Sequence, residues 1–164
     1  MDYTKNPFAP NDSDRHQIWA MLVERDIDAF IAADWSKHGP DFHAESFFGV
    51  NAHKSELPDS WRLDFPNLEA YRDEWLRQAA ATAKVKYAEP LREALFRATN
   101  MRDIDIAGDR AVCHKKFDGV VARADGGQDV LSWQTLYFCG RFNGVWKMTG
   151  FVGYMPFPMG KARS

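Results

Sequence analysis

The chain has 164 residues, of which 45% are hydrophobic and 14% aromatic, enough for one domain with a sizeable core. Its formal charge of −2 leaves no basic surplus to neutralise phosphates, so nucleic acid is not an expected partner. No window approaches about 18 uninterrupted apolar residues, and residues 1–30 are acidic without a signal-like apolar run. We therefore expect no membrane span, no export signal and a cytoplasmic location.

Cysteines, histidines and glycines form none of the common metal or cofactor motifs. Cys113 and Cys139 lie in segments expected to be strands, without a Cys-x-x-Cys pair, so we expect reduced, buried thiols. The five histidines form no His-x-His or His-Glu-x-x-His motif, and neither a nucleotide-binding glycine loop nor a Gly-x-Ser-x-Gly elbow is present. We therefore expect no metal and no cofactor.

Apolar residues in the first part of the chain recur at the spacing of helices. Residues 1–12 contain two prolines and no periodicity, which indicates an irregular arm. Apolar residues at helical spacing predict one helix over about 13–25. Asp26 has the side chain of an N-cap, so a second helix is expected to begin there and to end before Gly39-Pro40.

A short strand and a long loop are expected before the third helix. Residues 42–50 alternate loosely and predict the strand, and residues 51–66 have the composition of a loop. Asn67 is suited to cap the helix that follows, in which Tyr71 and Trp75 belong to an apolar stripe.

The rest of the chain is expected to form strands over 91–106 and 110–123 and then a final hairpin. Asn143-Gly144 supplies the positive φ angles of a type I′ turn between two runs rich in aromatic and β-branched residues. Helices followed by antiparallel strands indicate an α+β domain over 13–155, with the helices on one face of the sheet.

The order of these elements resembles that of the NTF2-like superfamily, which includes SnoaL-like cyclases, ketosteroid isomerase and scytalone dehydratase. The resemblance covers roughly residues 13–155, with Arg25-Asp26-Ile27-Asp28 at a helix junction and Gly144-Val-Trp-Lys-Met-Thr-Gly150 in the last strand. It implies a cone in which a curved, mostly antiparallel sheet packs on three N-terminal helices around an apolar pocket. It also implies a homodimer through the other face of the sheet. A C-terminal tail is expected over 156–164, and we expect the apolar, proline-broken stretch Met155-Pro-Phe-Pro-Met-Gly160 to pack across the subunit boundary.

His114 is the first candidate catalytic residue. In a strand, Lys116 shares its face, while Cys113 and Lys115 lie on the other. The resemblance places His114 near the catalytic histidine of scytalone dehydratase, and an apolar cone would keep its imidazole neutral and able to act as a base. The alternative is a histidine hydrogen-bonded across strands or on the dimer face. We interpret the Lys115-Lys116 pair itself as a solvated face.

Glu45 is the second candidate. Asp41, His43 and Glu45 alternate, so in a strand they share a face. The resemblance to ketosteroid isomerase places Glu45 nearest the general base, whose pKa an apolar pocket would raise. The alternative is ordinary amphipathicity, in which this polar side faces water.

Aromatic residues are candidates for the wall of the pocket. Trp133, Thr135 and Tyr137 alternate on one face of a central strand, and Trp35 and Trp146 come from elements that should converge on the cone. Aromatic walls with a few hydroxyls hold flat ligands, and His43 would add a polar contact. The alternative is that these aromatic residues only fill the core.

These candidates suggest a cofactor-independent lyase or isomerase, such as a dehydratase or cyclase, for a small hydrophobic or aromatic carbonyl compound. His114 or Glu45 would move the proton, and Tyr137 would polarise an oxygen. Neither known mechanism transfers intact, because Ile18 and Phe138 stand at the positions of the steroid isomerase's oxyanion hole. The alternative is a non-catalytic small-molecule-binding module, or an accessory or structural subunit of a larger complex. Convergence of ionisable groups inside the cone would separate these hypotheses.

Overall fold

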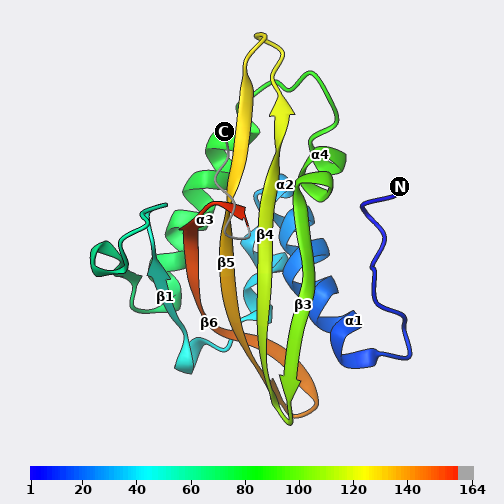
Figure 1. Ribbon diagram of the computed structural model, residues 1–164, viewed down its shortest axis with the longest axis vertical. Helices are drawn as coiled ribbons and strands as arrows, with labels where there is room; N and C mark the ends of the chain where they lie inside the picture. Colours follow the sequence, from blue (N-terminus) through cyan, green and yellow to red (C-terminus); the bar gives the residue numbers. More distant parts are fainter. Residues whose placement is uncertain (159–164) are drawn as a thin grey trace.

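Residues 1–158 are described by a computed structural model, in which helices cover one face of a six-stranded sheet (Figure 1). Helix α1 (Ser13–Trp19), a π-helical turn (Ala20–Arg25) and α2 (Asp26–Ala32) follow one another without a break. The run ends at Ala33, which has a left-handed φ of 51°. Two short 3₁₀ turns, Trp35–Lys37 and Gly39–Asp41, then lead toward the sheet.

The expected junction between two helices at residues 25 and 26 was wrong. Asp26 has helical backbone angles, φ −60° and ψ −50°, so it continues the helix and does not cap a new one. Its carboxylate accepts hydrogen bonds from Trp75 and Lys115, which lie on other elements, and makes no capping hydrogen bond. A residue that could cap a helix is here used for a tertiary contact.

The next helix agrees with the expectation. Asn67 accepts a hydrogen bond from the backbone N–H of Ala70 at 2.9 Å and so begins α3 (Leu68–Ala83). Trp75 and Ala79 are its buried residues, and they pack beside Ala29 of α2. Helix α3 therefore lies against α2, with its indole-bearing face turned inward.

The strand expected from residue 91 was wrong over its first eight residues, which form α4 (Leu91–Ala98). Leu91, Ala94, Leu95 and Ala98 recur at helical spacing, and all four belong to one apolar cluster on the sheet. A Cβ at Gly119 of the sheet would lie 2.7 Å from the Cβ of Ala98, which shows how closely the helix approaches. Helical periodicity was thus present in a segment for which a strand was expected.

The sheet has the strand order β2-β1-β6-β5-β4-β3, and β2 and β3 remain open edges. Its strands are β1 (Phe48–Asn51), β2 (Arg62–Phe65), β3 (Thr99–Ala107), β4 (Arg110–Ala122), β5 (Gln128–Phe142) and β6 (Val145–Pro156). Only the β1–β6 pair is parallel within this sheet. The expected α+β class, with a mostly antiparallel sheet, is confirmed.

The last hairpin agrees with the sequence, whereas the first strand does not. Asn143 and Gly144 have φ angles of 51° and 79°, so the type I′ hairpin between β5 and β6 is confirmed. The strand expected over 42–50 was mostly wrong, because a 3₁₀ turn occupies Ala44–Ser46 and β1 begins only at Phe48. Side-chain alternation before Phe48 therefore does not follow a strand.

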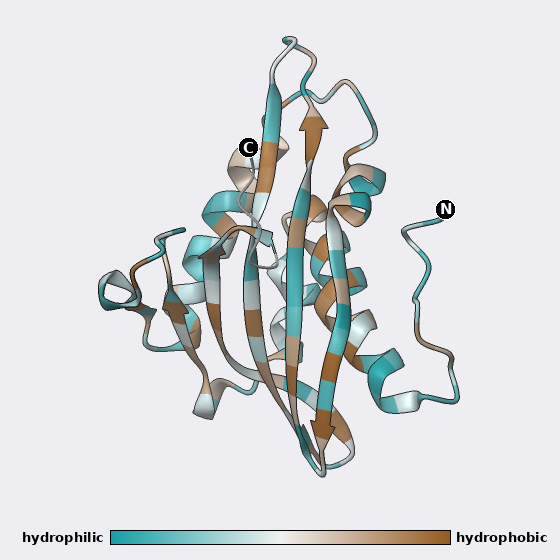
Figure 2. Cartoon of the chain, in the orientation of Figure 1, coloured by the Kyte–Doolittle hydropathy of each residue, from teal (hydrophilic) through white to brown (hydrophobic). Residues whose placement is uncertain are grey.

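The core lies between the helices and the inner face of the sheet. Strands β3 to β5 alternate between hydrophobic and hydrophilic residues along their length (Figure 2). Cys113 and Cys139 are free, buried thiols on the inner face, as expected. Within residues 1–158 no helix is long and apolar enough to cross a membrane. Of the expected C-terminal tail, residues 159–164 lie outside the described part of the chain.

Candidate functional site

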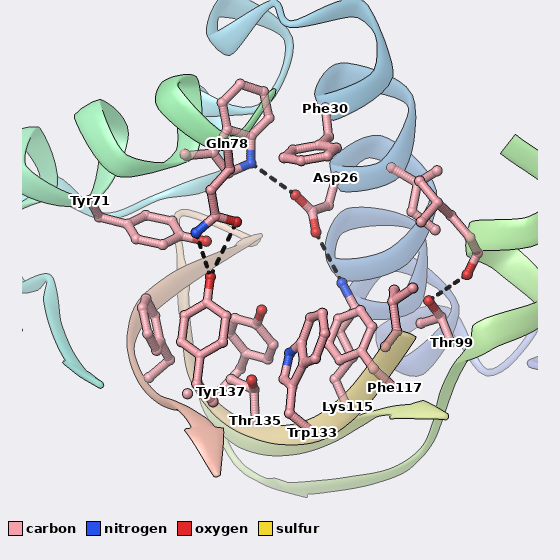
Figure 3. A pocket seen from close by; sticks show the side chains of 17 residues that line it. Asp26, Phe30, Tyr71, Gln78, Thr99, Lys115, Phe117, Trp133, Thr135 and Tyr137 are labelled. Carbon is pink, nitrogen blue, oxygen red and sulfur yellow. Dashed lines mark hydrogen bonds and ion pairs between the residues drawn. The ribbon is translucent and has the colours of Figure 1, made fainter. Parts of the chain in front are cut away.

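A cavity of about 150 Å³ lies between helices α2 and α3 and the inner face of β4, β5 and β6 (Figure 3). An apolar cavity of about this volume holds one aromatic ring. Much of its wall is aromatic, with contributions from Phe30, Tyr71, Phe117, Trp133, Tyr137 and Phe151. The rings of Phe117 and Trp133 stack with their centroids 4.6 Å apart, so this part of the wall is flat.

One ion pair reaches the cavity from opposite sides. Lys115 Nζ, on β4, lies 3.0 Å from Asp26 Oδ2, on α2, and also donates a hydrogen bond to the carbonyl oxygen of Leu22. Trp75 Nε1 donates to Asp26 Oδ1 at 3.2 Å. Lys115 is only 1% exposed. Figure 3 shows the Asp26 carboxylate and the Lys115 ammonium meeting at the edge of the cavity.

The surroundings of Asp26 keep it ionised. Burial disfavours the carboxylate, but the positive charge of Lys115, the neighbouring His38 and the hydrogen bonds from Lys115 and Trp75 outweigh it, so the pKa of Asp26 is lowered. The side chain still has 24% of its surface accessible, and it lines the cavity. A bound ligand would therefore meet a carboxylate and an ammonium group side by side.

Three hydroxyl groups on the cavity wall have no protein partner within residues 1–158: those of Tyr71, Thr135 and Tyr137. None of them is a sealed, unsatisfied polar atom, which means that each has surface toward the cavity. Burial, and after it the negative charge of Asp26, raises the pKa of Tyr137 well above its ordinary value. Tyr137 therefore remains a hydrogen-bond donor at neutral pH.

Further ionisable groups lie behind Asp26, on the side away from the cavity. His38 is 1% exposed, and its Nε2 lies 3.4 Å from Asp26 Oδ1. Its Nδ1 lies 3.0 Å from Asp41 Oδ2, and Arg25 binds the same Asp41 carboxylate from outside at 2.9 Å. A continuous series of ionisable groups thus extends from the cavity to the surface.

No protein-family model matches the sequence, and no curated protein matches it either. Several solved structures are similar to this chain in fold. An NTF2-like protein of unknown function from Pseudomonas putida KT2440 shares 15% identity, with a TM-score of 0.58 over 93% of this chain and 94% of that one. The chain has an NTF2-like fold.

Two further structures agree with this fold. An NTF2-like superfamily protein from Salmonella enterica serovar Typhimurium LT2 has a TM-score of 0.57 and 11% identity over 94% of this chain and 99% of that one. A domain of unknown function with a cystatin-like fold, from Nostoc punctiforme PCC 73102, has a TM-score of 0.52 and 11% identity over 93% and 82%. At these identities the likeness establishes the NTF2-like fold and leaves the chemistry to the site itself.

Of the candidates from the sequence, Trp133, Thr135 and Tyr137 line the cavity of this NTF2-like fold. His114 does not. It lies on the outer face of β4, where its Nε2 is 2.7 Å from Oε1 of Gln134 on the neighbouring strand β5. This is the cross-strand arrangement that the sequence left open as the alternative for His114.

Glu45 and His43 also lie away from the cavity. The Glu45 side chain is 82% exposed and lies 3.4 Å from Nε2 of His43. The His43 ring stacks on Phe142 with a centroid distance of 4.0 Å. Both residues precede β1, so the side-chain alternation of a strand does not apply to Glu45 and does not direct it toward the cavity.

Trp35 and Trp146 are packed in other parts of the structure. Trp35 stacks on Phe42 with a centroid distance of 5.1 Å and packs edge-on against Trp75. Trp146 is 3% exposed, and its Nε1 donates to Asp14 near the start of α1 at 2.9 Å. Neither tryptophan lines the cavity, although both contribute to the NTF2-like core.

The ion pair itself was missed. Lys115 was interpreted as part of a solvated face, which is wrong, although strand alternation with Cys113 had already placed it on the inner side. Asp26 was interpreted as a cap, yet it follows Leu22 and precedes Phe30 by four positions each, in line with a buried helical face. The available signal for the ion pair was that Asp26 and Lys115 both occupy positions where a helix or a strand is expected to bury an apolar residue.

Proposed function

We propose that the protein is a cofactor-independent lyase or isomerase for a small carbonyl compound with one ring, bound in the NTF2-like cavity. The observation that carries the proposal is the convergence of the Asp26–Lys115 pair and the Tyr137 hydroxyl on one aromatic-walled cavity. A buried ion pair is weak support for stability, so its position beside a cavity favours a role in chemistry. His114 and Glu45 have no part in this site.

The geometry supports a proton transfer next to a carbonyl group. The ligand's oxygen would accept hydrogen bonds from Tyr137 and Lys115, which draws the ammonium away from Asp26 and makes that carboxylate more basic. Asp26 would then take a proton from the carbon beside the carbonyl, and the electron pair of the broken C–H bond would become an enolate on the bound oxygen.

The enolate has two ways forward. Return of the proton from Asp26 to another carbon of a conjugated ligand completes an isomerisation. Alternatively, the enolate expels a hydroxyl group from the next carbon, and the proton of Asp26 leaves with it as water, which completes a dehydration. Both outcomes need only the groups already present in the cavity.

A non-catalytic binding protein is the second candidate, and one observation favours it. The pKa of Asp26 is lowered in the free protein, and the carboxylate already has three partners. A carboxylate with a low pKa is a weak base. On this alternative the ion pair and the hydroxyls only orient a ligand.

An exchange experiment separates the two candidates. The protein is incubated in D₂O with acetophenone or cyclohex-2-en-1-one, and loss of the hydrogens beside the carbonyl is followed by ¹H NMR. We expect saturable exchange that Asp26→Asn abolishes, while Glu45→Gln, which removes an exposed carboxylate outside the cavity, has no effect. Saturable binding without exchange would support the binding protein, and the absence of binding would contradict both candidates.

We also propose a homodimer through the outer face of the sheet, in the cytoplasm, with a small hydrophobic ligand as the other partner. The side of the sheet away from the helices exposes Phe48 and Val112, at 37% and 42%. Exposed large apolar side chains on one face are typical of an interface. Sedimentation equilibrium should give twice the mass of the chain, and a monomer mass would refute the dimer.

A further inference from the structure

The imidazole of His38 lies between two carboxylates with almost no contact with water. Its Nδ1 faces Asp41 at 3.0 Å, its Nε2 faces Asp26 at 3.4 Å, and the residue is 1% exposed. The rings of Phe42 and Trp35 lie edge-on to it, with centroids 5.0 and 6.1 Å away. Nδ1 is therefore hydrogen-bonded to one carboxyl group, and Nε2 lies within ion-pair distance of the other.

The contacts of His38 with Asp26 and Asp41 indicate how many protons these three side chains share. A neutral imidazole has one N–H and one lone pair, while a carboxylate can only accept a hydrogen bond. One of the two contacts would then bring lone pairs together in a buried place. Both contacts are favourable only when His38, Asp26 and Asp41 together carry one proton more than a neutral imidazole and two carboxylates do. Asp26 also accepts hydrogen bonds from Lys115 and Trp75, and Asp41 accepts them from Arg25, so both carboxylates are already stabilised as anions and the additional proton belongs to the ring.

The charges around an imidazolium at this position alternate in sign. From the surface inward, the groups are Arg25, Asp41, His38, Asp26 and Lys115, contributed by the helical run, the segment from His38 to Asp41 and β4. The other side chains in contact with the ring are the uncharged aromatics Trp35, Phe42 and Trp75. Every charge thus has neighbours of opposite sign, and the imidazolium is the link between the two carboxylates.

We propose that His38 is an imidazolium that positions Asp26 for the cavity, by donating Nε2–H to Oδ1 and holding the carboxylate toward Lys115 and the ligand. Loss of the ring proton weakens one of the three contacts that hold the Asp26 carboxylate in place, and the contacts with Trp75 and Lys115 remain. The protonation of His38 stands by itself, whereas its effect on turnover rests on the proposed function.

The first test measures the ring directly. In the ligand-free protein labelled with ¹⁵N-histidine, two-bond ¹H–¹⁵N correlation spectra distinguish an imidazolium, whose nitrogens resonate together, from a neutral ring, whose nitrogens resonate far apart. The His38 signals are assigned by their absence in His38→Gln. We expect the imidazolium pattern at pH 7, and a neutral pattern at that pH would overturn the proposal whether or not the protein is an enzyme.

The second test uses two amide variants that each keep one contact. In His38→Gln the side-chain amide can reach the place of Nε2 and donate to Asp26, while in His38→Asn it takes the place of Nδ1 and donates to Asp41. We expect the wild-type rate of acetophenone exchange per folded molecule to decline at high pH, where the ring loses its proton. His38→Gln should retain most of the wild-type rate and lose this decline, because an amide does not titrate. His38→Asn should lose about tenfold, the equivalent of one charge-assisted hydrogen bond.

A purely structural role for His38 gives a different result. Both variants would then lower the melting temperature and leave the exchange rate per folded molecule, and its pH profile, as in the wild type, which would overturn the positioning role. If the wild-type protein shows no exchange, the proposed function fails, and the NMR measurement still decides the protonation of His38.

Discussion

Replacing Tyr137 by phenylalanine is expected to slow ketone exchange by about 100- to 1000-fold, the usual effect of removing one donor to a developing oxyanion. The Tyr137 hydroxyl has no partner among the described residues, faces the cavity and stays protonated because burial and Asp26 raise its pKa. Phenylalanine keeps the aromatic wall. Ligand binding, measured by saturation of the NMR shifts, should therefore weaken far less than the rate.

Tyr154 supplies a matched control for this experiment. It lines the same cavity, but its hydroxyl oxygen accepts a hydrogen bond from Gln78 Nε2 at 3.0 Å, and its O–H donates to Gln78 Oε1 at 3.5 Å. Tyr154→Phe removes the same atom from the same wall without removing a free donor, so the exchange rate should stay close to that of the wild type. Equal losses in the two variants, or a loss below about tenfold in Tyr137→Phe, would contradict the role of Tyr137.

Much of the fold follows from local signals in the sequence. Asn143-Gly144 determines a hairpin because few other residue pairs adopt two successive positive φ angles, and here both angles are positive. Asn67 and the apolar stripe behind it determine α3 in the same way. Such signals work because the decisive interactions lie within a few residues of one another.

The errors in the fold arose where tertiary contacts decide between local alternatives. Leu91–Ala98 is short, and either a strand or a helix could bury its apolar residues. Gly119 and Ala98 settle the choice, since a glycine without a side chain facing an alanine methyl group allows the helix to lie directly on the sheet. That contact joins residues far apart in the sequence, so no short window contains it.

The contrast between local signals and tertiary contacts also explains which residues of the site could be predicted from the sequence. Tyr137, Thr135 and Trp133 could be assigned to one face because alternation along a long central strand is reliable. The ion pair joins Asp26 to Lys115 across 89 positions, and no motif or spacing links them. A charged residue at an apolar position of a helix or strand indicates that a partner exists, but the fold is needed to identify that partner.

Replacing Asp26 by leucine is expected to destabilise the protein by about 3–5 kcal/mol, the usual cost of leaving one charge of a buried pair without its partner. Lys115 is 1% exposed, and after the substitution its ammonium keeps one hydrogen bond within the described structure, to the Leu22 carbonyl, and its contacts with the rings of Phe117 and Tyr137. His38 loses one of its carboxylates as well. Urea denaturation at pH 7 measures the loss in the free energy of unfolding.

Removing both charges should reverse this loss. In the double variant Asp26→Leu, Lys115→Met no ammonium remains buried without a carboxylate, and apolar side chains of similar volume often match or exceed a buried ion pair by about 1–4 kcal/mol. We therefore expect the double variant to be at least as stable as the wild type and inactive in ketone exchange. A double variant as unstable as Asp26→Leu would show that the pair holds the fold together, and the argument for a functional pair would fail.

The pH dependence gives this comparison an independent check. Because the folded-state pKa of Asp26 is below its value of about 3.9 in the unfolded chain, its stabilisation is complete above that value and is lost as the pH falls through the folded-state pKa. The wild type should therefore lose more stability than the double variant between pH 5 and about pH 3. Asp103→Asn, at an exposed pair with Lys116, should change stability by at most about 1 kcal/mol and so leave most of the acid loss in place. Equal acid losses in the wild type and the double variant would mean that Asp26 is not held ionised by its partners, contrary to the geometry of the site.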